Sequence, residues 1–195
     1  MNVAPTVEPI TRAAWRAWLA GHHGTQDSIW LLYGRGAHAR PGELTYLDAV
    51  LEALCFGWID GLAKKQGELS AQRFTPRRAR SHWTELNKER ARRLIAAGAM
   101  AEAGRKILPD LSERALVLPA DVEARLRQDP VAWDHFQRFP DLYKRVRTSY
   151  IDEVKDKAER ERRLGNFLER TRKNELFGNW DDSALPVTKE PGRNG

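Results

Sequence analysis

The chain has 195 residues, of which 41% are hydrophobic and 31% are charged. This length allows one sizeable core or two small subdomains, and this composition excludes an intrinsically disordered chain. No apolar run approaches the roughly 20 residues that a membrane span needs, so we expect no membrane-spanning segment. The formal net charge of +6 favours anionic partners such as nucleic acid, anionic metabolites or anionic lipid.

The cysteine content and the N-terminal residues predict the cellular compartment of the protein. Cys55 is the single cysteine, which excludes an internal disulfide and a cysteine zinc cluster and fits a reducing compartment. Residues 1–9 contain neither the basic stretch nor the apolar stretch that begins a secretion signal. We therefore expect a cytoplasmic protein.

The first predicted elements are a helix and a strand. Thr11 is a suitable N-cap for a helix over residues 12–21, whose tryptophans and leucine share one face. Residues 28–33 are a short apolar run closed by Gly34, which is typical of a buried strand. Residues before Thr11 contain two prolines and are expected to form an extended lead-in.

The strongest helix signal begins at Thr45. Thr45 and Asp48 have the spacing of a capping box, in which each side chain bonds the other residue's backbone amide. Apolar residues then recur at helical spacing up to Cys55, and Gly57 can supply the left-handed residue that ends the helix. Residues 58–65 and 68–74 follow as the two strands of a predicted hairpin that turns near Gln66-Gly67.

Helices are predicted beyond the hairpin. Ser81 or Thr84 can cap a helix that Gly98 ends. A shorter helix is expected over residues 100–108, with Gly104 as a weak point because glycine disfavours helix.

The remainder of the chain is predicted to be a linker, a helical region and a tail. Residues 109–119 resemble a linker. Asp129-Pro130 and Phe139-Pro140-Asp141 are helix starts, since proline is tolerated in the first turn. Residues 156–176 are expected to form a heavily charged helix, and residues 181–195 a disordered tail.

These elements predict an α+β fold. A small antiparallel sheet packs against helices and is followed by a mainly helical C-terminal region. The sheet consists of residues 28–33, 58–65 and 68–74, and its helices are residues 12–20 and 45–56. The predicted domains are a mixed α/β region at residues 1–108, a helical region at 109–180 and a disordered tail at 181–195.

Motifs in both halves of the chain resemble those of one known family. In the first half they are Leu54–Gly61, Arg73–Arg77, Ser81-x-Trp83, Asn87–Arg90 and Gly98-x-Met100-x-x-x-Gly104. In the second half they are Tyr150-Ile151-x-x-Val154-Lys155 and Arg160-x-Arg162-Arg163-Leu164. Together they cover most of residues 12–173 and are similar to the YdeI/OmpD-associated family of bacterial proteins, also labelled bacteriocin-protection.

This resemblance implies a small, soluble bacterial protein connected with tolerance of bacteriocins or envelope stress. It supplies no reaction and no catalytic residues, and we expect no cofactor. Residues 154–159 depart from the Ala-Lys-Lys-Pro-Glu-Thr-like segment expected in the family.

The charge excess is concentrated in one short segment. Residues 73–93 hold eight basic and two acidic residues, so their net charge equals that of the whole chain. Arginine forks bind phosphates and carboxylates, and neighbouring aromatic rings can stack on bases. We predict an anionic ligand, either nucleic acid or a phosphate-bearing molecule, although a solvated loop or an ion-pair network explains the same residues. The predicted ligand-binding residues are Trp58, Asp60, Arg73, Phe74, Arg77, Arg78, Arg80, Ser81, Trp83 and Lys88.

Asp60 allows two interpretations. It is a candidate general base or ligand acceptor in a cleft, or it forms a partly buried ion pair with Arg73 or Arg77 that fixes the loop. No residue is assigned as catalytic. Cys55 lies on the apolar helix face and is expected to behave as a small hydrophobe. The five histidines are scattered, so no metal site is predicted.

Three functional hypotheses follow. The first is a non-enzymatic binding or stress-tolerance protein that engages an anion through the basic segment. The second is an enzyme acting on a small anionic substrate, with Asp60 moving the proton and Arg77 holding the substrate. The third is a protein-interaction module that uses the helical C-terminal half.

Overall fold

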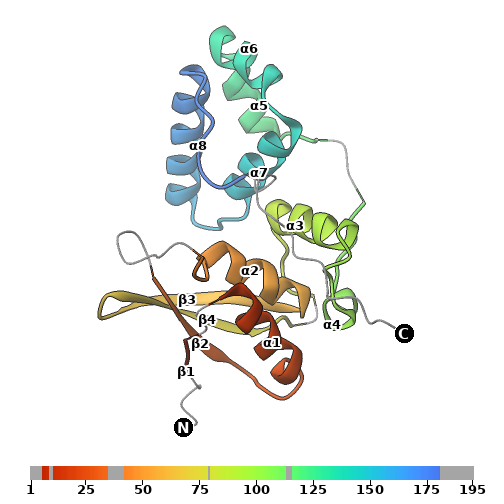
Figure 1. Cartoon of the computed structure of the whole chain (residues 1–195). Helices are drawn as coiled ribbons and strands as arrows, with labels where there is room; N and C mark the ends of the chain where they lie inside the picture. Colours follow the sequence, from red (N-terminus) through yellow and green to blue (C-terminus); the bar gives the residue numbers. More distant parts are fainter. Residues whose placement is uncertain (1–5, 9–10, 35–41, 79, 113–115, 181–195) are drawn as a thin grey trace. The chain divides into compact units, whose positions relative to one another are not determined.

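Figure 1 shows the computed structural model of the chain, which describes residues 6–8, 11–34, 42–78, 80–112 and 116–180. The chain divides into two compact units. Among the described residues, the first unit comprises those up to 81 together with 91–110 and contains a sheet and helices. The second unit comprises 82–90 and the described residues from 111 to 180, and its secondary structure is helical. The predicted α+β fold with a helical C-terminal region is confirmed.

The sheet has four described strands in the order β1-β2-β4-β3. They are β1 (Thr6–Val7), β2 (Ile29–Tyr33), β3 (Trp58–Gln66) and β4 (Leu69–Pro76). The three predicted strands pair antiparallel, as expected. β1 lies in the segment predicted to be an extended lead-in. It pairs parallel with β2, so the sheet is mixed.

The hairpin of β3 and β4 contains a tight turn and a bulge. Gln66 pairs with Leu69, which leaves a two-residue turn whose first residue, Gly67, has a φ of 61°. Glycine is favoured at that position because it adopts positive φ without steric penalty. Between Asp60 and Ala63 the register shifts, and the Gln72 side chain donates hydrogen bonds to the carbonyls of residues 61 and 62. Gln72 therefore satisfies backbone groups where the regular ladder is interrupted.

Two capped helices, α1 (Arg12–His22) and α2 (Tyr46–Cys55), cover one face of the sheet (Figure 1). The Thr11 hydroxyl accepts a hydrogen bond from the amide of Ala14, and both bonds of the Thr45 capping box are present. Gly57 has a φ of 78°, which matches its predicted role just after the helix. Local sequence signals therefore set the ends of both helices.

Aromatic rings join these helices to the sheet. Trp15 is fully buried; its ring lies 5.5 Å from that of Phe74, and its indole nitrogen donates a hydrogen bond to the carbonyl of Ala49. Trp18 contacts Trp58 edge to face at 6.0 Å. Phe74 pairs with Ile29, which is also fully buried, so these side chains mark the core face of the sheet.

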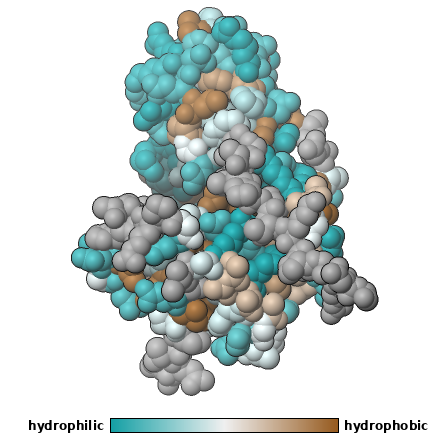
Figure 2. Space-filling view, viewed as in Figure 1, coloured by the Kyte–Doolittle hydropathy of each residue, from teal (hydrophilic) through white to brown (hydrophobic). Residues whose placement is uncertain are grey.

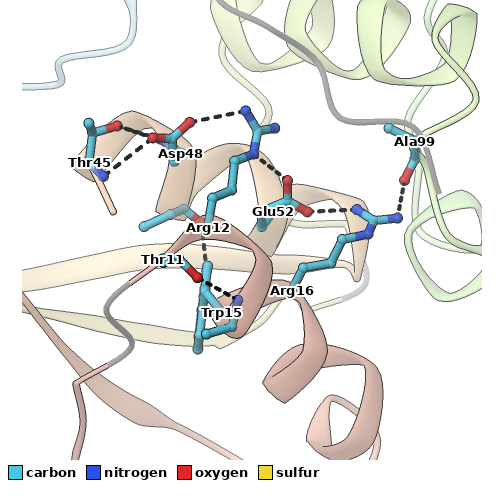
Figure 3. Close-up of polar contacts among 10 residues, drawn as sticks. Thr11, Arg12, Trp15, Arg16, Thr45, Asp48, Glu52 and Ala99 are labelled. Atoms are coloured by element: carbon cyan, nitrogen blue, oxygen red, sulfur yellow. Dashed lines mark hydrogen bonds and ion pairs between the residues drawn. The ribbon is translucent and has the colours of Figure 1, made fainter. Parts of the chain in front are cut away.

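A buried carboxylate ties α1 to α2. Glu52 is fully buried, and its two oxygens accept hydrogen bonds from Arg12 at 2.5 Å and from Arg16 at 2.6 Å (Figure 3). Arg12 also pairs with the capping residue Asp48, and Arg16 donates to the carbonyl of Ala99 at 2.8 Å. The network therefore holds two helices and the 97–101 segment in one arrangement.

Gly104 is a packing contact rather than the predicted weak point. It lies in the short helix α4 (Glu102–Arg105) and is buried. A Cβ atom at this position would lie 2.2 Å from the carbonyl oxygen of Cys55. Glycine is therefore required here because the backbones of α4 and the end of α2 approach each other closely.

Helix α3 (Glu85–Ala96) begins directly after Thr84, the second of its two predicted N-caps. The Thr84 hydroxyl, and not that of Ser81, accepts a hydrogen bond from the amide of Asn87. Gly98 has a φ of 69° just past the helix end, as predicted.

Four complete helices of the described residues lie in the second unit, which also contains the start of α3. They are α5 (Ala120–Arg127), α6 (Pro130–Arg138), α7 (Asp141–Asp152) and α8 (Lys157–Arg172). Asp129 caps α6 as predicted, whereas α5 was not predicted as a separate element. The apolar core includes Phe136, Tyr143 and Phe167. In the view of Figure 2, hydrophilic residues predominate over these helices, in agreement with their high charge. The predicted disordered tail lies outside the described residues.

Within the described ranges, no helix is both long and apolar enough to cross a membrane.

Substituting Glu52→Gln is expected to destabilise the protein by about 3 kcal/mol, because two arginines then lose their buried countercharge. The measurement is the free energy of unfolding from urea titration. The matched control is Glu102→Gln, which removes a largely exposed carboxylate paired with Lys106 and is expected to change stability by about 0.5 kcal/mol or less. Equal effects of the two substitutions would contradict the structural role of Glu52.

Substituting Gly104→Ala is expected to lower the melting temperature, since overpacking of a close backbone contact costs about 1–3 kcal/mol. Gly165 provides the control, because it lies within α8 and a Cβ there meets no atom within 4 Å. Gly165→Ala should raise stability by about 1 kcal/mol or less through helix propensity. A stabilising Gly104→Ala would show that α4 does not pack on the end of α2 as described.

Candidate functional site

The face of the sheet opposite α1 and α2, called here the outer face, carries the strongest candidate for ligand binding. Side chains alternate along a strand, and paired residues share a face. Phe74 points to the core, so its neighbours Arg73 and Thr75 point outward. Trp30 pairs with Arg73, and Ile59 pairs with Thr75, which places all four side chains on the outer face.

A hollow of about 560 Å³ opens over this face where β3 begins and β4 ends, and we call it the sheet hollow. Its lining residues are Asp27, Ile59, Gly61, Leu62, Arg73, Thr75, Pro76, Arg78 and Ser81. Three of the predicted ligand-binding residues, Arg73, Arg78 and Ser81, therefore meet in one concave surface.

Arg73 is the central cation of the sheet hollow. Its side chain is partly buried, and its Nε atom is buried without a hydrogen-bond partner among the described residues. Arg78 is exposed at the same hollow. Asp27 is the one acidic lining residue, and no ion pair joins it to either arginine within the described part of the chain. The hollow is therefore lined by two guanidinium groups and one carboxylate that do not pair with each other.

A tight turn positions the rim of the hollow. The amide of Ser81 donates a hydrogen bond to the carbonyl of Arg78 at 3.1 Å. Arg80, within this turn, has a φ of 63°, a region that non-glycine residues seldom adopt. Arg80 is exposed and does not line the hollow.

Trp30 and Lys64 extend the outer face, and sequence reasoning missed both. The Lys64 ammonium lies 4.2 Å from the centre of the Trp30 ring, which is a cation–π contact. The apolar run at residues 28–33 predicts a buried strand. In the structure, Ile29 and Leu31 are its fully buried residues, and Trp30 between them is only partly buried. The alternation of residues 29–31 was the signal that could have identified Trp30 as an outward-facing ring.

Arg77 is held mainly by the fold. It is 7% exposed, its amide donates to the carbonyl of Gly57 at 2.8 Å, and a guanidinium nitrogen lies 3.5 Å from the Ser81 hydroxyl. Burial lowers the pKa of the guanidinium to about 10, and the charge of Asp60 acts in the opposite direction. Arg77 therefore remains charged at neutral pH but is not a lining residue of the hollow.

Of the two predicted partners of Asp60, Arg77 is supported by the influence of the Asp60 charge on its pKa, whereas Arg73 is not. Asp60 pairs in register with Phe74, so it points to the core side of the sheet, whereas Arg73 points to the outer face. The hydroxyl of Tyr46 donates a hydrogen bond of 2.7 Å to Asp60. The strand period of two residues separates these two side chains, and Asp60 does not line the sheet hollow.

The predicted role of three aromatic rings as flat ligand surfaces is also wrong. Trp58 and Phe74 are 1% and 0% exposed and belong to the core beneath α1. Trp83, in the second unit, is 7% exposed. Lys88, also in the second unit, bonds Glu85 at 2.6 Å. Buried rings cannot stack on a ligand, so Trp30 replaces them as the accessible ring beside Arg73.

Cys55 behaves as a core residue. Its side chain is fully buried, and burial raises the pKa of the thiol to about 12, with a further contribution from Glu52. In the described part of the chain, no group of three histidine, cysteine or acidic residues has the geometry of a metal site.

Comparison with family models divides the chain into two parts. Residues 7–107, about half of the chain, match the model described as a domain of unknown function, DUF8412. Residues 115–174 match the model described as bacteriocin-protection, YdeI or OmpD-associated. The predicted resemblance is confirmed for the second half, whereas the motifs at 54–104 lie within the DUF8412 match. No curated protein and no solved structure matches the chain.

The Cys55 thiol is expected to resist alkylation in the native protein, since the thiolate is the reactive form and burial suppresses it. At pH 8, iodoacetamide should react at least about a hundredfold more slowly with native protein than with protein unfolded in urea. Mass spectrometry measures the modified fraction, and Cys55 is the single possible site. Equal rates in both states would show that the thiol is accessible.

Proposed function

We propose that this chain, a member of the DUF8412 family that also carries a YdeI or OmpD-associated domain, binds single-stranded nucleic acid on the outer face of its sheet. The observation that carries the proposal is that Arg73 lines the sheet hollow and pairs across the strands with Trp30 on the same face. This arrangement supplies a cation and an accessible ring side by side. Proteins that bind single strands commonly combine these two groups.

Arg73 and Arg78 are suited to a phosphate group in the sheet hollow. A guanidinium presents a planar set of donors that matches phosphate oxygens. The Ser81 side chain lines the same hollow and offers a further hydroxyl donor. Two arginines against the single carboxylate of Asp27 give the hollow a positive balance.

Trp30 and Lys64 are suited to the adjacent nucleotide. Trp30 is half-buried, so its ring is fixed by the sheet while part of its surface stays accessible. Base stacking on such a ring contributes about 1–3 kcal/mol per base and tolerates any base. Lys64 is exposed and adds a cation beside the ring. We therefore propose binding with little sequence preference.

The family description supports a biological setting for this binding. The match at residues 115–174 carries the words bacteriocin-protection, and we extend that role to this chain as part of the proposal. The protein would then act by binding rather than by catalysis. A small phosphate-bearing molecule in the hollow is the alternative occupant that the following experiment separates from nucleic acid.

Fluorescence anisotropy of a labelled single-stranded oligonucleotide tests the proposal. The double variant Arg73→Met/Arg78→Met is expected to bind at least tenfold more weakly than the native protein. Because each phosphate contact contributes about 0.7 to the salt dependence for single strands, the slope of log K against log salt should fall by about 1.4.

The matched control removes the same charge elsewhere in the first unit. Arg105→Met/Lys106→Met eliminates two cations of α4 and should change binding less than threefold. Absence of binding by the native protein at low salt, or equal losses in both double variants, would overturn the proposal. Binding of inorganic phosphate in isothermal titration calorimetry, without any affinity for the oligonucleotide, would assign the hollow to a small anion instead.

A further inference from the structure

The second unit contains a separate cavity of about 220 Å³ between α7, α8 and the segment that follows α8. Its lining residues are Arg147, Tyr150, Ile151, Arg162, Arg163, Asn166, Phe167 and Phe177. We call it the Arg147 cavity. It combines three arginines with aromatic rings, and none of these residues belongs to the outer face of the sheet.

Arg147 is a nearly buried cation that forms no ion pair with a carboxylate of the described residues. Arg147 is 8% exposed. Its Nε atom is buried and has no hydrogen-bond partner among the described residues. One terminal nitrogen donates to the carbonyl of Asn179 at 3.0 Å. Burial lowers the pKa of the guanidinium, and electrostatic interactions with Tyr143 and Tyr150 act in the opposite direction.

A buried charge of this kind normally has a counterion, because an uncompensated ion in a protein interior is strongly destabilising. Two cation–π contacts compensate Arg147 in part, with its guanidinium 5.5 Å from the Tyr150 ring and 5.2 Å from the Phe177 ring. These contacts leave the Nε donor unused. A bound anion in the cavity that Arg147 lines would supply the missing negative charge.

The other two arginines increase the positive charge of the cavity. Arg162 and Arg163 share a single carboxylate, Glu159, at 2.7 and 2.8 Å. Arg163 also lies 3.8 Å from the centre of the Tyr150 ring, which Arg147 approaches too. The three arginines of the cavity therefore have one carboxylate partner between them, Glu159. Arg147 and Arg163 both contact the ring of Tyr150.

The backbone after α8 holds Arg147 in place. Gly178 has a φ of 69°, and a Cβ there would lie 2.5 Å from a terminal nitrogen of Arg147. Together with the Asn179 carbonyl, this close approach fixes the guanidinium before any ligand arrives. Such preorganisation reduces the entropy lost on binding.

We propose that the Arg147 cavity binds a small molecule in which a phosphate monoester is attached to a planar ring. A phosphate monoester carries a charge of about −1.5 to −2 at pH 7, which matches an excess of two cations better than a carboxylate does. The rings of Tyr150 and Phe177 provide surfaces for the planar group. The volume suits a molecule with one ring and does not admit a polymer chain.

Isothermal titration calorimetry of the full chain with phenyl phosphate tests this proposal. The native protein is expected to bind one equivalent at least tenfold more tightly than it binds benzoate, which has the ring but a single negative charge. Arg147→Met should weaken phenyl phosphate binding at least tenfold. Arg138→Met, which removes an exposed arginine paired with Asp134 on α6, is the charge-matched control and should bind within twofold of native protein.

A second variant keeps the test decisive if Arg147→Met fails to fold. Asn166 is exposed at the cavity, so Asn166→Trp should fill the space while leaving all three arginines in place. It should also lose at least tenfold in affinity, with folding verified by circular dichroism. Absence of saturable binding by the native protein, or native affinity in a folded Asn166→Trp variant, would overturn the proposal.

Discussion

The arrangement of the first unit depends on one buried carboxylate. Glu52 accepts hydrogen bonds from Arg12 and Arg16, and the same arginines reach Asp48 and the carbonyl of Ala99. Desolvating these charges is unfavourable, so the network is stable only when all partners are in place. The network therefore holds α1 against α2, and these two helices cover one face of the sheet and form the core with it. The outer face, which carries Arg73 and Trp30, is the face on which we propose that a ligand binds.

Local signals predicted much of the fold. The Thr45–Asp48 capping box, the left-handed glycine after α2 and the hairpin turn each depend on a few adjacent residues. The helix starts at Asp129 and Pro140 follow from the same short-range chemistry. The concentration of charge in residues 73–93 also indicated the region of the sheet hollow, since Arg73, Arg78 and Ser81 all line it.

Features that depend on distant partners were not predictable. Asp60 and Arg73 lie on opposite faces because strand pairing, and not sequence distance, decides where side chains point. Trp58 and Phe74 are buried because α1 covers them, and Trp30 is accessible because it lies on the other face. Gly104 and Arg147 owe their environments to contacts with residues far along the chain, Cys55 and the segment after α8.

Chemical-shift mapping is the most direct test of the central claim that the covered core face leaves the outer face for binding. The ¹H–¹⁵N spectrum of the intact protein would be recorded during titration with a single-stranded oligonucleotide. The structure predicts shifts of the Trp30 indole and of the amides of Lys64 and Arg73, while the indoles of Trp15 and Trp58 stay unchanged. Shifts concentrated on the core-face indoles, or none on β2 and β4, would contradict the account.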